Sequence, residues 1–152
     1  RTGINLSAVY RPLNNMFLNP LMENIRKKYI CKNQIKKGIS GTKQLLQQFK
    51  NKNSIALMID QRVSEGIKVN LFNEMASTTT IPGQFVKKFN VRIVPIYIER
   101  LKENNFKLKI YDPIKFGNVE TIETITQKLN LILEKMIIKN PEQWIWTHNR
   151  WK

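Results

Sequence analysis

The stretch SIALMIDQRVSEGIKVNLFNEMASTTTIPGQFVKKFNVRIVPIYIER, from Ser54 to Arg100, decides the fold. It begins with an apolar run, residues 55–59, that has the length of a buried strand. This run ends on Asp60 and Gln61. Because open α/β sheets bind their ligands at the carboxyl ends of their strands, Asp60 and Gln61 are candidate site residues.

The rest of the stretch predicts a short strand over residues 69–72, a helix and a second buried strand. Thr80 ends a run of three threonines, which are residues that cap helices. The helix predicted after it places Phe85, Val86 and Phe89 toward a core. The second strand, over residues 92–98, ends on Glu99 and Arg100. The stretch therefore predicts a strand–loop–helix–strand unit with polar groups at its strand ends.

Upstream, residues 4–10 read as a strand that stops at Arg11, because proline follows. The planar guanidinium of Arg11 then lies at a strand's carboxyl end, where it suits a phosphate or a carboxylate. A surface arginine at a turn is the alternative interpretation. We expect a helix to begin at Asn19, which can cap it, and its cations at residues 26–28 read as a solvated helix end.

Between this helix and the central stretch, residues 32–41 read as a basic loop and residues 42–52 as a second helix. Downstream, the alternation of residues 106–111 predicts a strand with one wet face, as in an antiparallel pair. Asn118 is expected to cap a long amphipathic helix, and the apolar stripe of this helix favours packing on a core over a membrane surface. The order of these elements predicts an α/β fold.

Composition and charge narrow the range of functions. The chain has 152 residues, one domain's worth, and 41% of them are hydrophobic, so we expect a folded core. The formal charge is +15, which favours a polyanionic partner. Nucleic acid, an anionic membrane, phosphorylated substrates and an acidic protein all satisfy this charge. A general compositional bias toward lysine is the structural alternative.

Several kinds of chemistry are not supported by the sequence. The single cysteine, Cys31, excludes a disulfide within the chain, and zinc-ligand spacing is absent. The single histidine, His148, lies among tryptophans and reads as a packed or capping residue rather than as part of a triad. No phosphate-binding or dinucleotide-binding glycine motif occurs. Nucleic-acid binding would rest on charge alone, and no apolar run is long enough for a transmembrane helix.

The chain closes with PEQWIWTHNRWK, residues 141–152. Tryptophans beside Arg150 and Lys152 suit a membrane interface. They also suit a terminal segment that packs back on the domain. The sequence leaves both interpretations open.

Four motifs together resemble the lipid A biosynthesis acyltransferases, the lauroyl and myristoyl transferases of the glycerolipid acyltransferase superfamily. The resemblance covers essentially the whole chain, and the closing PEQWIWTHNRWK is its most specific motif. The motifs are VYRPLNN at 9–15, IDQ at 59–61, STTTIPGQFVKKFNVRIVPIYIER at 77–100 and PEQWIWTHNRWK at 141–152.

The resemblance implies a three-layer α/β sandwich with a mostly parallel central sheet. It implies transfer of a fatty acyl chain from acyl carrier protein to a hydroxyl of an anionic, phosphorylated lipid A precursor. The expected location is the cytoplasmic face of the bacterial inner membrane, with the membrane surface as a further partner. Neither a cofactor nor nucleic acid is expected. The implied site residues are Asp60 in a supporting catalytic role and Arg11, Gln61, Thr80 and Arg100 in substrate binding.

The chain departs from this family at its catalytic signature, a His followed after four residues by Asp or Glu. His148 has no acidic residue at that spacing. The resemblance therefore implies that residues 1–152 are the carboxyl-terminal portion of an acyltransferase domain, with a sheet incomplete at its amino-terminal side and no activity alone. Two alternatives remain. One is a sister acyltransferase that acts on a glycerolipid or glycolipid, and the other is a non-catalytic basic domain that binds anionic lipid or nucleic acid.

Overall fold

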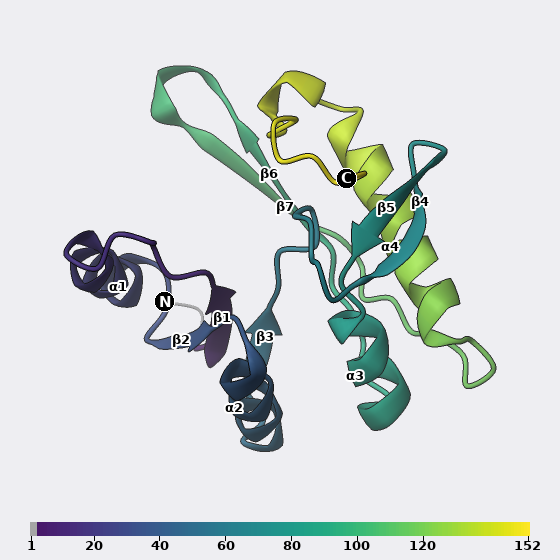
Figure 1. Cartoon of the computed structure of the whole chain (residues 1–152), viewed down its shortest axis with the longest axis horizontal. Helices are drawn as coiled ribbons and strands as arrows, with labels where there is room; N and C mark the ends of the chain where they lie inside the picture. Colours follow the sequence, from purple (N-terminus) through teal and green to yellow (C-terminus); the bar gives the residue numbers. More distant parts are fainter. Residues whose placement is uncertain (1–2) are drawn as a thin grey trace. The chain divides into compact units, whose positions relative to one another are not determined.

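The structure, a computed structural model, describes residues 3–152. The chain divides into two compact units, residues 1–58 and residues 59–152 (Figure 1). The first unit contains a parallel sheet, and the second contains two antiparallel hairpins and a long helix. The predicted α/β class is thereby confirmed.

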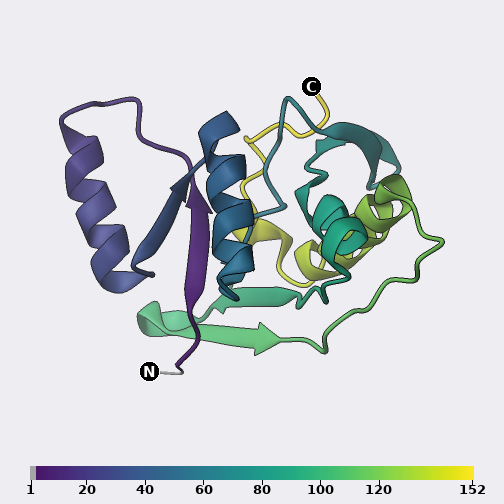
Figure 2. The ribbon, with the colours of Figure 1, turned by 90° about the horizontal axis from the view of Figure 1, so that it is seen from below.

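The first unit is built on a parallel sheet with the strand order β2-β1-β3. Its elements are β1 (Leu6–Tyr10), α1 (Leu18–Tyr29), β2 (Asn33–Lys36), α2 (Ile39–Lys50) and β3 (Ser54–Ala56). The chain moves outward from β1 to β2 and then back across β1 to β3. With right-handed crossovers, this path places α1 on one face of the sheet and α2 on the other (Figure 2). The result is a three-layer α/β arrangement.

The two faces of this sheet differ in polarity. Toward α2, Ile35 and Leu45 are each 2% exposed, and Ser7 Oγ donates a weak hydrogen bond to Gln48 Oε1 at 3.4 Å. Toward α1, the phenol of Tyr10 donates to a carboxylate. The apolar core of the first unit therefore lies between the sheet and α2.

The second unit begins with a hairpin of β4 (Ile67–Leu71) and β5 (Glu74–Thr78). The hairpin packs on α4 (Ile122–Ile137), and α3 (Ile81–Phe89) also contacts α4. Two buried apolar clusters hold these elements together. The first consists of Leu71, Ala76, Leu133 and Ile137, and the second of Val86, Phe116, Ile125 and Leu129.

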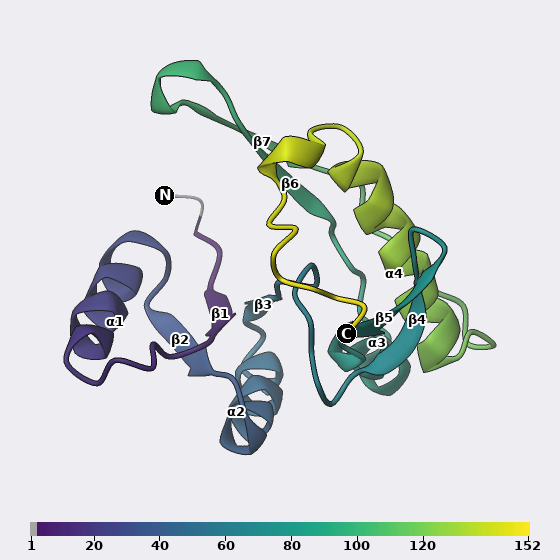
Figure 3. The same cartoon turned by 45° about the horizontal axis from the view of Figure 1, so that its top comes forward.

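A second hairpin pairs β6 (Ile96–Arg100) with β7 (Phe106–Ile110). The strand predicted over residues 106–111 is present and its pairing is antiparallel, but the expected single wet face is wrong, because every residue of β7 is exposed. Short 3-10 turns lie at Lys102–Asn104 and Pro141–Gln143. The terminal segment returns past α4 toward β5 (Figure 3), where the backbone N of Ser77 donates to the carbonyl O of Arg150 at 3.0 Å.

Several sequence-based boundaries were wrong. The loop expected over residues 32–41 contains β2, whose single buried residue, Ile35, gives no strand pattern until β1 lies beside it. The threonine run begins inside β5 rather than in the helix cap. The buried strand expected over residues 92–98 begins only at Ile96, and its residues alternate between exposed and half-buried.

The helix starts also differ from those expected. The side chain of Asn15, not that of Asn19, accepts hydrogen bonds from the backbone N atoms at the start of α1. At α4 the capping side chain is Thr121, which accepts from the backbone N of Thr124, rather than Asn118. In both cases another Asn or Thr close by in the sequence caps the helix, because both residue types can do so.

Gly66 gives a prediction about the second unit. A Cβ at this position would lie 2.2 Å from the carbonyl O of Thr78, which belongs to a paired strand and cannot move freely. We expect Gly66→Ala to destabilise the chain by about 1–3 kcal/mol, as overpacking does. The measurement is the urea midpoint by circular dichroism. Gly117→Ala is the control, because its nearest neighbour would lie 3.8 Å away, and an equal loss in both variants would contradict the prediction.

Candidate functional site

A buried arginine from the terminal segment organises the candidate site of the second unit. The side chain of Arg150 is 0% exposed. Its Nη1 donates to the carbonyl O of Ile59 at 2.9 Å, and its Nη2 donates to Thr78 Oγ1 at 2.7 Å. One guanidinium thus joins the segment before Asp60 to the end of β5, although these segments lie far apart in the sequence.

Asp60 supplies the opposite charge. Burial lowers the pKa of Arg150, while the negative charge of Asp60 acts in the opposite direction and favours the charged guanidinium. Within the described residues, Asp60 Oδ1 is buried and accepts no hydrogen bond, and Arg150 Nε donates none. Buried polar atoms without partners are rare and often mark functional sites. The Asp60 carboxylate is therefore close enough for its charge to act on the guanidinium of Arg150, although no ion pair joins the two side chains in the described residues.

Asn130 extends this arrangement from α4. Its Nδ2 donates to Thr78 Oγ1 at 3.1 Å and to the carbonyl O of Asn70 at 2.9 Å. Asn130 is 0% exposed and Thr78 is 1% exposed. Asp60, Thr78, Asn130 and Arg150 form what we call the polar cluster. Such a network, shielded from water, fixes one geometry because each broken contact would leave a buried group unsatisfied.

Of the predicted site residues in the second unit, one belongs to the polar cluster and the others lie outside it. Asp60 belongs to the polar cluster, and Gln61 is the exposed residue that follows it. β3 ends at Ala56, so this pair lies in a loop after the strand rather than at the strand's last residue. Thr80 precedes α3, and its hydroxyl accepts from Gln84 Nε2 at 2.9 Å. The prediction that Asp60 and Gln61 follow a strand is correct, but the strand ends earlier than expected, at Ala56.

Arg100 has other neighbours. It is the last residue of β6, and its backbone exchanges two hydrogen bonds with the side chain of Gln143. Its guanidinium lies over the ring of Phe106, 5.4 Å from the centroid. These contacts join the hairpin to the 3-10 turn at Pro141–Gln143 and are not part of the polar cluster.

Arg11 belongs to the first unit, where it is exposed directly after β1. The strand's last residue, Tyr10, donates to Glu23 Oε1 at 2.7 Å, and the same oxygen accepts from Asn19 at 2.7 Å and lies 3.2 Å from Lys36 Nζ. The predicted position of Arg11 at a strand's carboxyl end is confirmed. The carboxyl end of β1 is thereby held in place by hydrogen bonds to α1.

This network shifts two pKa values in opposite directions. The hydrogen bond from Tyr10, followed by those from Asn19 and Lys36, lowers the pKa of Glu23 to about 2. Burial, followed by the hydrogen bond to Glu23, raises the pKa of Tyr10 to about 12. Each shift favours the protonation state that the Tyr10–Glu23 hydrogen bond requires.

Asn130 and Arg150 were not predicted as site residues, and Thr78 was expected at a helix start rather than at the end of β5. Thr78 and Asn130 carry no sequence signal for burial together, since they come from a threonine run and from a helix. Arg150 had a usable signal, because it lies in PEQWIWTHNRWK. His148 is exposed, and its Nδ1 accepts a long hydrogen bond of 3.4 Å from the backbone N of Arg62.

The tryptophans of the terminal segment pack on the second unit. Trp144 and Trp151 pack against the apolar cluster that contains Leu71, and Trp151 Nε1 donates to the carbonyl O of Leu71 at 3.1 Å. Trp146 stacks on Trp151 with a centroid separation of 6.5 Å. The terminal segment therefore packs back on its own unit, which was one of the two interpretations left open.

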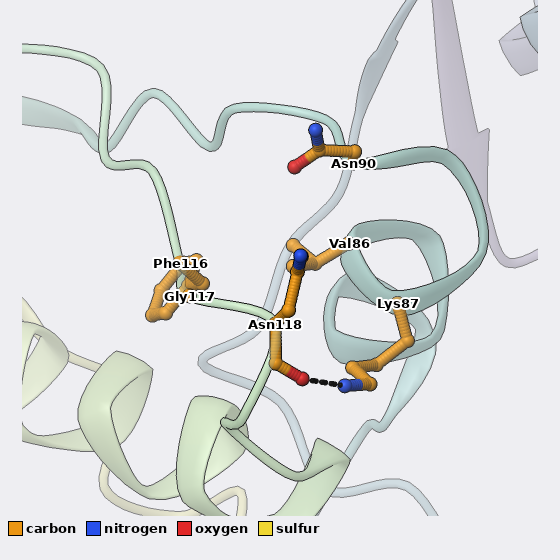
Figure 4. Close-up of a pocket in the computed structure, with 6 residues that line it drawn as sticks. All are labelled: Val86, Lys87, Asn90, Phe116, Gly117 and Asn118. Carbon is orange, nitrogen blue, oxygen red and sulfur yellow. Dashed lines mark hydrogen bonds between the residues drawn. The ribbon is translucent and has the colours of Figure 1, made fainter.

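A shallow pocket of about 210 Å³ lies beside the carboxyl end of α3 (Figure 4). Its lining residues are Val86, Lys87, Asn90, Phe116, Gly117 and Asn118. The Nζ of Lys87 already donates to the carbonyl O of Asn118 at 2.7 Å. The partial negative charge of a helix carboxyl end disfavours a phosphate there. This pocket includes no predicted site residue and is not the candidate site.

A family model for bacterial lipid A biosynthesis acyltransferases matches residues 2–152. The chain belongs to this family. No curated protein matches the chain.

Two kinds of feature are absent from the part of the chain that the structure describes. No described residues bring together three or more His, Cys, Asp or Glu side chains that could hold a metal ion. None of the helices found in residues 3–152 combines the length and the apolar character needed to cross a membrane.

Arg150 gives a prediction about stability. We expect Arg150→Met to destabilise the acyltransferase by about 3 kcal/mol or more, because it removes two hydrogen bonds from a charged donor and leaves their acceptors buried. Arg150→Lys should lie between this variant and the original chain, since an ammonium keeps the charge but not the fork of donors. The free energy of unfolding in urea is the measurement.

The control for this variant is Arg92→Met, which removes an exposed arginine of the same unit. It should change the free energy of unfolding by no more than about 0.5 kcal/mol. Equal effects at positions 92 and 150 would show that the buried contacts of Arg150 contribute nothing.

Glu23 gives a prediction about pH. Its pKa in the folded chain is below the ordinary value of 4.5, so its stabilising contribution is present above pH 4.5 and is lost as the pH falls toward about 2. Glu23→Gln should remove this part of the acid dependence. Urea midpoints at pH 6 and pH 3 test this, and an unchanged difference between the two midpoints would contradict it.

Proposed function

We propose that this chain is part of an enzyme that transfers a fatty acyl chain from acyl carrier protein to a hydroxyl of a phosphorylated lipid A precursor. The observation that carries this proposal is membership of the lipid A acyltransferase family over residues 2–152. The proposed location is the cytoplasmic face of the bacterial inner membrane. The formal charge of +15 supports the proposal, since the acceptor, the membrane and the carrier protein are all anionic.

Residues 1–152 supply acceptor-binding groups in this proposal. Arg11, exposed at the end of β1, has the planar fork of donors that suits a phosphate. Asp60 has a buried oxygen free to accept a hydrogen bond, and it would orient a group that takes part in proton transfer. Gln61 and Thr80 would add neutral hydrogen bonds, and Arg100 a second cation. No described contact of these residues requires a metal or a cofactor.

The general base is supplied from elsewhere in this proposal. His148 is engaged with the backbone of Arg62 in the second unit. A His followed after four residues by Asp or Glu, upstream of residue 1, would remove the proton from the acceptor hydroxyl. The resulting oxygen would attack the thioester carbonyl, and the thiol of the carrier protein would leave with the proton.

The first test is a comparison of two proteins with acyl-loaded carrier protein and the phosphorylated acceptor. The chain of residues 1–152 alone should show no transfer, while a version extended upstream to a His-x4-Asp/Glu motif should show transfer. Turnover by residues 1–152 alone would refute the proposed origin of the base. Acceptor profiling of the extended protein against glycerolipids and other glycolipids separates the sister acyltransferase.

The second test uses the acceptor-binding residues. In the extended protein, Arg11→Ala and Asp60→Ala should each lower acyl transfer by about 10²-fold or more, because each removes a positioned charge or hydrogen-bond acceptor. Arg92→Ala, at an exposed arginine, is the matched control. Salt-sensitive lipid binding that survives both changes together, without transfer by the unchanged protein, would favour a non-catalytic binding domain instead.

A further inference from the structure

α1 exposes the apolar side chains that a helix of this kind normally buries. Leu18, Leu21 and Ile25 follow one another at helical spacing and are 50%, 56% and 39% exposed. Just before the helix, Met16 is 82% exposed and Phe17 is 91% exposed. No residue of α1 is buried. The amphipathic pattern of the sequence was predicted correctly, but its apolar side does not serve the core.

The side of α1 that contacts the sheet is mostly polar, with Met22 as its one half-buried apolar residue. Glu23 accepts hydrogen bonds from Asn19 and from Tyr10 of β1 and pairs with Lys36 of β2, and Arg26 lies over the ring of Tyr10 at 5.0 Å. In an ordinary surface helix the apolar stripe faces the core and the polar side faces water. α1 has the reverse orientation, so its apolar row is available to another apolar medium. Exposed apolar patches of this kind mark interaction surfaces.

The charge around this row is almost entirely positive. Residues 1–58 contain eleven lysines and arginines against one acidic residue, Glu23, an excess of ten out of the net +15 of the whole chain. The carboxylate of Glu23 is already held by Tyr10, Asn19 and Lys36. The last turn of α1 carries Arg26, which faces the sheet, and two exposed cations, Lys27 and Lys28. Within the described residues no carboxylate forms an ion pair with Lys27 or Lys28, so the exposed side of this turn is positively charged.

We propose that α1, with Met16 and Phe17, is an interfacial helix by which the chain lies on an anionic lipid bilayer. The apolar row would enter the boundary between headgroups and acyl chains, and the flanking cations would contact lipid phosphates. The aliphatic part of a lysine or arginine side chain can lie beside the acyl chains while its charged end extends to the headgroups. This assignment rests on the proposed membrane location and names the surface that achieves it.

A lipid surface fits these observations better than a protein partner does. An acidic carrier protein would attract the same cations, but it would not require a row of large apolar side chains as exposed as Met16 and Phe17. A second copy of the chain would bring the same excess of ten positive charges against itself, and like charges repel. A bilayer of anionic lipids satisfies both the apolar row and the charge.

The test is binding of the 152-residue chain to sedimenting vesicles. Vesicles of phosphatidylglycerol and phosphatidylethanolamine should bind the chain, phosphatidylcholine vesicles should bind it far less, and raised salt should weaken the anionic binding. Leu21→Gln with Ile25→Gln should weaken binding about ten-fold or more, because two apolar side chains no longer leave water. Both positions are exposed, so the melting temperature should stay the same.

The matched control is Ile96→Gln with Ile98→Gln. It removes two apolar side chains that are 54% and 60% exposed on β6 of the second unit, and it should leave vesicle binding unchanged. A direct readout uses Cys31→Ser as background and an environment-sensitive dye on Phe17→Cys or on Val119→Cys, positions that are 91% and 93% exposed. Only the dye at position 17 should shift to the blue on anionic vesicles.

The outcomes separate the two proposals. If the unchanged chain does not bind anionic vesicles, the membrane location itself is overturned. If it binds but the variant in β6 loses binding while the variant in α1 keeps it, the location stands and the assignment to α1 is overturned. The assignment is also overturned if the change in α1 leaves vesicle binding intact and instead abolishes binding of acyl carrier protein or self-association in sedimentation.

Discussion

The structure of the second unit depends on one buried guanidinium. Arg150 brings a charge from the last residues of the chain into a site that is 0% exposed, where it binds the carbonyl O of Ile59 and the hydroxyl of Thr78. Taking a charge out of water is costly unless its donors are matched. The terminal segment must therefore pack in one way, with Trp144 and Trp151 against the apolar cluster, for these contacts to form. This constraint also fixes the loop that carries Asp60.

The same constraint gives the loop that carries Asp60 a fixed geometry. Hydrogen-bonded networks in a low-dielectric interior specify geometry more than they add stability. Thr78 and Asn130 position the guanidinium, and the guanidinium in turn attracts the Asp60 carboxylate. An acyltransferase needs such a fixed charge, because catalysis depends on groups that are already oriented before the substrate arrives. Gln61, the residue after Asp60, is exposed.

In the first unit, polar contacts hold a helix against the sheet, whereas in the second unit a buried charge holds the terminal segment. The apolar core of the first unit lies on one face of the sheet, between the strands and α2, while α1 is held by the polar contacts of Glu23. Most of the positive excess of the chain belongs to this unit. A helix held by its polar side leaves its apolar side for a surface outside the fold. The proposed membrane-lipid acceptor would give such a helix a use.

The sequence by itself determined the α/β class, the family and the strand that precedes Arg11, because these rest on local apolar patterns and on short motifs. It did not determine β2, whose single buried residue, Ile35, becomes a strand residue only beside β1. Nor did it show that Arg150 reaches Thr78 or that α1 turns its polar side inward. These features depend on contacts between residues far apart in the chain, and only the tertiary structure decides which distant groups leave water together.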